Sequence, residues 1–167
     1  DLRTLTNELE KLCTYTGKGE ITASIIDRLV TRNLDANVFM LGKAIVAGEY
    51  DKAYGILDLL FYQNEEPVSV LAALSSVYLD LYRVRASIQS GLTAQEPAKH
   101  FDYKGKEFRL RNAERDVRRL SLAALRESLG VLLDTDAAHK GARGSRRIVM
   151  EKMIARLLLA AQKEKLA

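Results

Sequence analysis

Clusters of basic side chains are the best candidates for a binding site in this sequence. Between Lys104 and Arg119 the chain carries seven Lys or Arg residues and three acidic ones, and this excess of four positive charges equals the net charge of all 167 residues. Arg111, Arg115 and Arg118 would share one face of a helix, because they are spaced four and then three residues apart. Such a face could neutralise nucleic-acid phosphates. A solvated helix face with ion pairs within the helix explains the same pattern.

A second basic group lies in and directly after a glycine-containing loop and consists of Lys140, Arg143, Arg146 and Arg147. Basic side chains on such a loop, just before a helix N-terminus, suit contact with a backbone phosphate. We therefore predict these four residues as candidate DNA contacts. The face of Arg111, Arg115 and Arg118 is the alternative DNA-binding face.

Residue types for catalysis or metal binding form no recognisable pattern. Two histidines and one cysteine are too few for a zinc site, and Cys13, His100 and His139 lack the spacing of ligands. Asp136 and His139 are three residues apart, as a catalytic pair on a helix could be, but this spacing is typical of a solvated surface contact. The sequence also lacks a Walker-type phosphate loop and a dinucleotide fingerprint. We expect no catalytic site, no cofactor and no metal.

Composition predicts an all-α fold class. The chain is 47% hydrophobic, which is enough for a substantial core, and its two prolines and ten glycines leave long stretches for helices. No segment alternates as a strand would.

No apolar run is long enough to span a bilayer, and the single cysteine excludes an internal disulfide, so we expect a cytoplasmic protein without a membrane partner. Because the first residue is Asp, we expect the chain to begin inside a longer protein.

Apolar periodicity and capping residues predict a series of helices. They cover residues 2–15, 22–30, 35–47, 51–63, 67–90, 93–100, 106–120, 121 to the Gly141 loop, and 145 onward. The polar stretch 31–35 is predicted as a domain hinge. The helix beginning at Pro67 is expected to be the central post of a bundle, because it carries two apolar stripes and must be covered on more than one side. The stripes are Leu71, Leu74, Tyr78, Leu81 and Ile88, and Val70, Val77 and Val84.

The last two predicted helices supply further core residues. Those expected to point inward are Leu122, Leu125, Leu129, Leu132 and Leu133, and then Met150, Met153, Ile154, Leu157, Leu158 and Ala161. Ile148, Val149 and Leu159 lie off these stripes, and we predict them as residues of a partner interface. A neighbouring helix of the same domain would cover them equally well.

Several short motifs together resemble one family. They are Asp1-Leu-Arg3 with Asn7-Glu-Leu-Glu-Lys-Leu12, Asn37-Val-Phe, and Glu65-Glu-Pro67. The chain is similar to the C-terminal part of the delta subunit of the bacterial DNA polymerase III clamp loader. The resemblance implies the end of an AAA+-like lid domain at residues 1–33 and a helical collar, or oligomerisation, domain at residues 34–167. Arg3 falls where ATP-hydrolysing relatives sense the nucleotide, but the delta family is not thought to hydrolyse ATP, so we expect a structural or interdomain role.

The resemblance also implies partners and a function. The implied function is a non-catalytic assembly module that forms the collar ring of a hetero-oligomer for loading the sliding clamp in DNA replication. Implied partners are the gamma/tau and delta prime subunits, primer–template DNA within the complex, and the sliding clamp through the missing N-terminal domain. The parent complex is a DNA-directed DNA polymerase by resemblance only. The alternative function is an independent helical DNA-binding regulator that uses the Arg111, Arg115 and Arg118 face and binds duplex DNA alone.

Overall fold

A computed structural model of the chain describes residues 6, 7, 10, 23–141 and 144–163. The chain divides into two compact units, residues 1–36 and residues 37–167. Most of the helix predicted at residues 2–15, together with Arg3, Cys13 and Arg143, lies outside the described residues. None of the described helices is long and apolar enough to cross a membrane.

The described elements are all helical, and the part of the chain that the structure describes contains no strand. In order, the elements are α2 (Ala23–Ala47), α3 (Tyr50–Tyr62), α4 (Pro67–Gln89), the 3₁₀ turn η1 (Glu96–Lys99), α5 (Phe108–Asp116), the 3₁₀ turn η2 (Val117–Arg119), α6 (Leu122–Gly141) and α7 (Arg146–Gln162). The all-α prediction is therefore confirmed. The single helix predicted at 106–120 is shorter and ends in the tighter turn η2.

Helix α2 corrects the prediction for residues 31–35. The polar stretch was expected to separate two helices, but α2 runs without interruption from Ala23 to Ala47. The stretch contains neither Gly nor Pro, and Asn33 and Asp35 are exposed, so nothing in it prevents helical backbone geometry. The predicted break in the helix is wrong. The domain boundary between residues 33 and 34 stays a prediction.

The ends of the other early helices follow the predicted glycine and proline signals. Gly48 and Gly91 adopt φ values of 76° and 75°, in the left-handed region where glycine meets no Cβ penalty. Just after α4 in the sequence, Leu92 N donates a hydrogen bond to Ser87 O at 2.9 Å, which closes the C-terminus of the helix. Pro67 is the first residue of α4, where its missing N–H costs no helical hydrogen bond.

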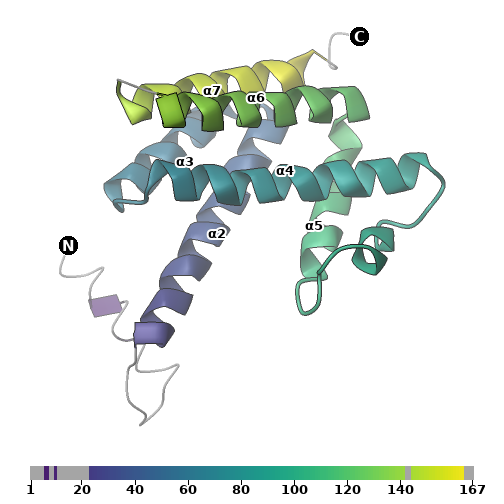
Figure 1. The fold of residues 1–167 in the computed structure, drawn as a ribbon, viewed down its shortest axis with the longest axis horizontal. Helices are drawn as coiled ribbons and strands as arrows, with labels where there is room; N and C mark the ends of the chain where they lie inside the picture. Colours follow the sequence, from purple (N-terminus) through teal and green to yellow (C-terminus); the bar gives the residue numbers. More distant parts are fainter. Residues whose placement is uncertain (1–5, 8–9, 11–22, 142–143, 164–167) are drawn as a thin grey trace. The chain divides into compact units, whose positions relative to one another are not determined.

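Helix α4 is the central helix of the bundle, as predicted. It packs against α5, α6 and α7 and against both 3₁₀ turns, and Figure 1 shows it crossing the middle of these elements. Its buried residues are Pro67, Val70, Leu71, Leu74, Tyr78, Asp80, Leu81 and Val84. Val77 is half-buried. Ile88 was expected to be buried but is 38% exposed, in the last turn before the chain leaves at Gly91.

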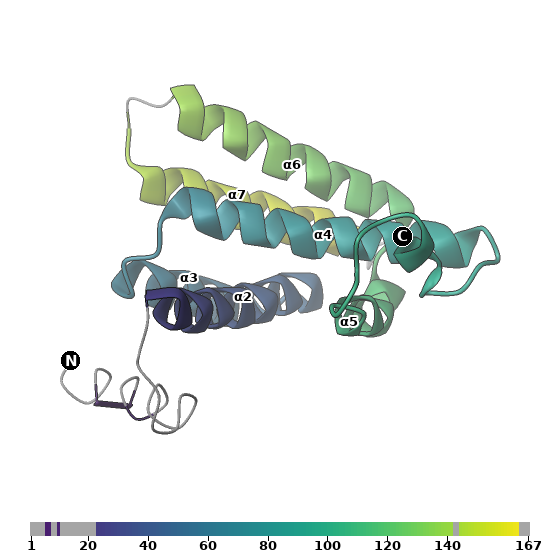
Figure 2. The same cartoon turned by 60° about the horizontal axis from the view of Figure 1, so that its bottom comes forward.

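Helices α6 and α7 form an antiparallel pair that packs on α4, as Figures 1 and 2 both show. The six inward residues predicted for α7 are all buried, and Leu125 and Leu132 of α6 are buried as well. Leu122 and Leu129 are half-buried. Leu133 was expected to point inward but is 70% exposed, because it lies about 100° around the helix from its buried neighbour Leu132.

Serine side chains cap both helices at their predicted starts. Ser121 Oγ accepts a hydrogen bond from Ala124 N at 3.1 Å, and Ser145 Oγ accepts one from Ile148 N at 3.4 Å. Each hydroxyl satisfies a backbone donor that the first turn of a helix leaves without a partner. These caps fix where α6 and α7 begin.

Candidate interaction surfaces

The possible catalytic pair on α6 does not form. Lys140 Nζ donates to Asp136 Oδ2 at 2.5 Å, whereas His139 Nε2 lies 3.3 Å from Met150 Sδ on α7. The carboxylate and the imidazole therefore contact different side chains. Among the residues that the structure describes, no group of three or more His, Cys, Asp or Glu side chains could hold a metal ion.

The loop group of basic residues lies among acidic side chains. Lys140 pairs with Asp136, and Arg146 Nη1 lies 3.8 Å from Glu66 Oε2 at the start of α4. Arg147 has two acidic partners, Asp58 on α3 and Glu151 on α7, the latter at 3.0 Å. Its guanidinium also lies 5.3 Å from the centre of the Phe61 ring. The hydrogen bond to Glu151 is the main cause of the raised pKa of Arg147. The three described members of this group thus already have acidic partners, and Arg143 lies outside the described residues.

The arginines of the alternative DNA-binding face are exposed and have no such partners in the described part of the chain. Arg111 and Arg115 lie on α5 and Arg118 lies in η2, and all three are exposed. Arg115 donates to the Asn112 side chain, a neutral group. Within residues 23–141 and 144–163, none of the three arginines forms an ion pair. Their charges therefore remain available to an external anion.

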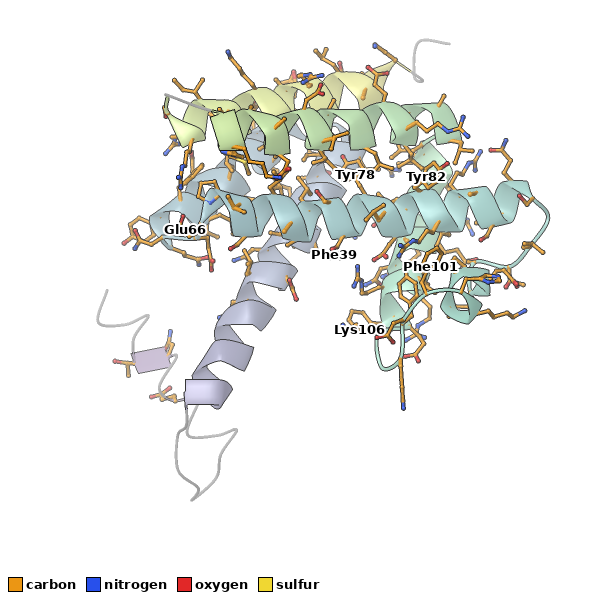
Figure 3. All side chains as sticks on the ribbon, in the orientation of Figure 1. Phe39, Glu66, Tyr78, Tyr82, Phe101 and Lys106 are labelled. Atoms are coloured by element: carbon orange, nitrogen blue, oxygen red, sulfur yellow. The ribbon has the colours of Figure 1, made fainter. Side chains whose placement is uncertain are left out.

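A loop with more exposed cations and aromatic rings precedes α5. Lys104 and Lys106 of this loop are exposed, Phe101 is 46% exposed, and Phe108, the first residue of α5, is exposed as well. Figure 3 labels Phe101 and Lys106 on this segment between α4 and α5. The Arg83 guanidinium of α4 lies 3.7 Å from the centre of the Phe101 ring, which is a close cation–π contact. This contact ties the loop to the central helix.

Asp80 on α4 is the centre of a buried polar network that the sequence patterns above did not predict. Its carboxylate accepts a hydrogen bond from the Tyr103 hydroxyl at 2.6 Å and another from Arg109 Nε at 2.7 Å. Arg83 Nη1 donates to the same Tyr103 hydroxyl at 3.0 Å. Burial, followed by the hydrogen bond to Asp80, raises the pKa of Tyr103, while Arg83 opposes the rise.

This network positions the exposed arginines. It connects α4 to the loop through Tyr103 and to α5 through Arg109, so it fixes the orientation of the helix that carries Arg111 and Arg115. A signal was present in the sequence, because Asp80 is an acidic residue inside the apolar stripes of α4. A buried carboxylate needs partners, and a basic residue and a tyrosine follow within the next thirty positions.

The predicted partner residues differ in exposure. Ile148 is 52% exposed and Leu159 is 59% exposed, whereas Val149 is half-buried. A third exposed apolar side chain, Leu133, lies on α6. Leu159 lines a groove of about 490 Å³ between α6 and α7, together with Gly130, Val131 and charged residues of both helices. The outer side of the α6–α7 pair therefore leaves apolar surface uncovered.

Comparisons with known proteins agree with this architecture. Residues 35–157 match the family model described as DNA polymerase III delta subunit, C-terminal domain. The chain is 28% identical over 163 residues to DNA polymerase III subunit delta of Bacillus subtilis, covering 97% of this chain and 46% of that protein. A solved structure of the Bacillus subtilis DNA clamp loader delta protein superposes with a TM-score of 0.71 at 28% identity, covering 95% of this chain and 46% of that one. The chain spans about half the length of these relatives. It belongs to the DNA polymerase III delta subunit family, whose C-terminal domain it contains.

Proposed function

We propose that this chain is the part of a clamp-loader delta subunit through which the subunit assembles with its siblings. Residues 1–33 would end a lid domain, and residues 34–167 would form the collar domain in a cytoplasmic complex with the gamma/tau and delta prime subunits. The sliding clamp would bind through an N-terminal domain outside this chain. In this role the chain is a non-catalytic accessory part of the polymerase complex.

The observation that carries the proposal is the uncovered apolar surface on α6 and α7. Leu133, Ile148 and Leu159 are each more than half exposed, on a pair of helices whose opposite sides bury an apolar core. Large apolar side chains left exposed on a folded unit can mark a surface that another protein covers. A ring of subunits also needs two different contact surfaces on each member, because its interfaces are heterologous.

Co-purification tests this function. The full-length protein should elute together with gamma/tau and delta prime when all three are co-expressed and one sibling carries the affinity tag. The matched control is the same protein without residues 37–167, which should be lost from the complex. Elution of the full-length protein alone, with the siblings recovered as a complex without it, would contradict the assembly role.

Primer–template DNA is a second proposed partner, within the assembled loader. The two candidate contacts are the loop group of Lys140, Arg143, Arg146 and Arg147, and the arginine group of Arg111, Arg115 and Arg118 on α5 and η2. We favour the arginine group, because its members are exposed and lack acidic partners in the described part of the chain, whereas Lys140, Arg146 and Arg147 have them. Phosphate contacts by the loop group would require these ion pairs to be exchanged.

A gel shift with the chain alone separates this role from that of an independent DNA-binding regulator, which would bind duplex DNA without the siblings.

A further inference from the structure

The groove between α6 and α7 has an apolar floor at which the helix backbone is open. Gly130 and Val131 of α6 and Leu159 of α7 line it. A Cβ atom added at Gly130 would meet no heavy atom within 4 Å, so the packing of this chain does not require glycine at this position. The missing side chain lets another helix approach the α6 backbone closely. Leu133, three residues after Gly130, continues the same face of α6.

The two edges of the groove carry opposite charges. Glu127 and Asp134 lie on the α6 edge, and Arg156 and Lys163 lie on the α7 edge. Arg156 Nη2 is 2.8 Å from Asp134 Oδ2, and Lys163 Nζ is 2.7 Å from Glu127 Oε1. Because the helices are antiparallel, Glu127 lies seven residues before Asp134 on α6, and Lys163 lies seven residues after Arg156, directly past the end of α7. Two ion pairs about two helical turns apart therefore span the groove, with the acidic members on the α6 edge and the basic members on the α7 edge.

These ion pairs can be exchanged at little cost. The four side chains are between 45% and 67% exposed, and ion pairs at such exposure contribute little to stability. A partner that supplies a cation to Glu127 or Asp134 and an anion to Arg156 or Lys163 would replace each pair with new ones. Charge complementarity of this kind sets the orientation and register of an interface.

We propose that this groove receives one amphipathic helix of another clamp-loader subunit, an inference that rests on the proposed assembly function. The docked helix would place an apolar seam over Gly130, Val131 and Leu159. Along the edge that faces α6 it would carry Lys or Arg, and along the edge that faces α7 it would carry Asp or Glu, each repeated after seven residues. Three helices in contact through apolar seams with charged flanks pack as in a coiled coil.

Filling the groove is the first test. In the full-length protein, Gly130→Leu places a large side chain on the groove floor, and Gly55→Leu is the matched control. Gly55 is an exposed glycine of α3 where an added Cβ also meets nothing within 4 Å. Thermal melts should show that both variants fold at least as well as the wild type. Sedimentation with gamma/tau and delta prime should give a dissociation constant raised at least tenfold by Gly130→Leu and unchanged by Gly55→Leu.

Reversing the two edges is the second test. The combined variant Glu127→Lys, Asp134→Arg, Arg156→Asp and Lys163→Glu keeps both cross-helix ion pairs and the net charge but exchanges the acidic and basic edges. It should fold as the wild type does and bind the siblings at least tenfold more weakly, whereas the single change Asp136→Asn outside the groove should not weaken binding.

The outcomes separate this proposal from the assembly function. If the wild type joins the siblings and both the Gly130→Leu and edge-reversed variants join with unchanged affinity, the groove proposal is wrong and the assembly function stands. If the wild type does not join them, both fail. If the wild type alone sediments as a dimer that Gly130→Leu converts to a monomer, the occupant is a second copy of this chain and the proposal of a sibling helix is overturned.

Discussion

Asp80 of α4 and Arg109 of α5 form a hydrogen-bonded ion pair of 2.7 Å between Oδ2 and Nε, although 29 residues separate them. The Asp80 side chain is only 6% exposed, whereas that of Arg109 is 32% exposed. The carboxylate therefore depends on its partners in the protein, while the guanidinium keeps some access to water. This relationship makes Asp80 the member whose loss should cost more.

Replacing Asp80 with Asn should destabilise the fold by about 2–4 kcal/mol, near the cost of breaking a buried pair and leaving one charge without its partner. Asparagine keeps one acceptor oxygen but replaces the other with an NH2 donor, so either Tyr103 or Arg109 would lose its acceptor. Chemical denaturation measures the change. The control is Asp134→Asn, which breaks the exposed pair with Arg156 and should cost less than about 1 kcal/mol. Equal losses for the two variants would contradict a special role for the buried network.

Alkaline pH should destabilise the fold through its buried tyrosines. Burial raises the pKa of Tyr78 strongly above its ordinary value of 10.0, and burial together with Asp80 raises that of Tyr103. When the pH exceeds about 10, the unfolded chain loses these phenolic protons and the folded chain retains them, so the free energy of unfolding falls as pH rises. Below about pH 10, titration of these two tyrosines should not change the free energy of unfolding.

Melting temperatures measured from neutral pH to above pH 10 check this expectation. Tyr78→Phe should flatten the alkaline decline, because phenylalanine has no proton to lose. Tyr62→Phe is the matched control, since Tyr62 is 77% exposed and should leave the decline unchanged. An alkaline decline of the same steepness in Tyr78→Phe and the wild type would count against the buried phenol as its cause.

Alanine at two glycines should change stability in opposite directions. At both Gly91 and Gly130 an added Cβ meets nothing within 4 Å, but Gly91 has φ +75° whereas Gly130 lies inside α6. Gly91→Ala should cost about 1–2 kcal/mol, the penalty for a side chain in the left-handed region. Gly130→Ala should gain about 0.5–1 kcal/mol, because alanine favours helix over glycine. Chemical denaturation of the two variants side by side isolates the backbone conformation as the cause.

A third glycine tests packing. A Cβ at Gly42 of α2 would lie 3.1 Å from Val77 Cγ1 on α4, closer than ordinary van der Waals contact. The β-branched Val77 has few rotamers with which to move away. Gly42→Ala should therefore lose the helix-propensity gain seen at Gly130 and be neutral or destabilising by chemical denaturation. A gain as large as that of Gly130→Ala would show that the contact between α2 and α4 is loose.

Salt dependence should identify which basic group contacts DNA. Replacing Arg111, Arg115 and Arg118 with Ala in the assembled loader should weaken DNA binding and reduce the salt slope by as much as roughly 0.9 for each lost phosphate contact. Alanine at Lys140, Arg146 and Arg147 is the control of equal charge change and should leave the slope nearly unchanged. A larger effect from the control group would show that Lys140, Arg146 and Arg147 contact the DNA instead.

Sequence patterns predicted the elements wherever apolar spacing and a terminal residue agreed. Pro67 and Gly91 marked the ends of α4, and Ser145 marked the start of α7. Errors arose where only one kind of signal was present. The polar residues 31–35 were interpreted as a hinge although polarity alone does not end a helix.

Interactions between distant segments could not be read from local spacing. Leu133 follows two buried residues, and only the position of α4 and α7 decides which side of α6 is covered. In the same way, Arg147 binds Asp58, which lies 89 residues earlier, so its charge looked available in the sequence and is paired in the fold. The predicted DNA contacts depended on such long-range pairs, and spacing along a helix carries no information about them.

The position of α4 at the centre of the bundle has a consequence for local opening. Because α5, α6 and α7 all rest on it, α4 cannot lose its packing unless several neighbours detach together. Its amide protons should therefore exchange with deuterium only through global unfolding, at the slowest rate in residues 37–163. Amides of the segment 101–107 should exchange through smaller fluctuations, since their backbone lies in bends and turns and not in a helix. Helices α5, α6 and α7, which present the outward surfaces, would thus be packed on α4, the element of the domain that opens most slowly.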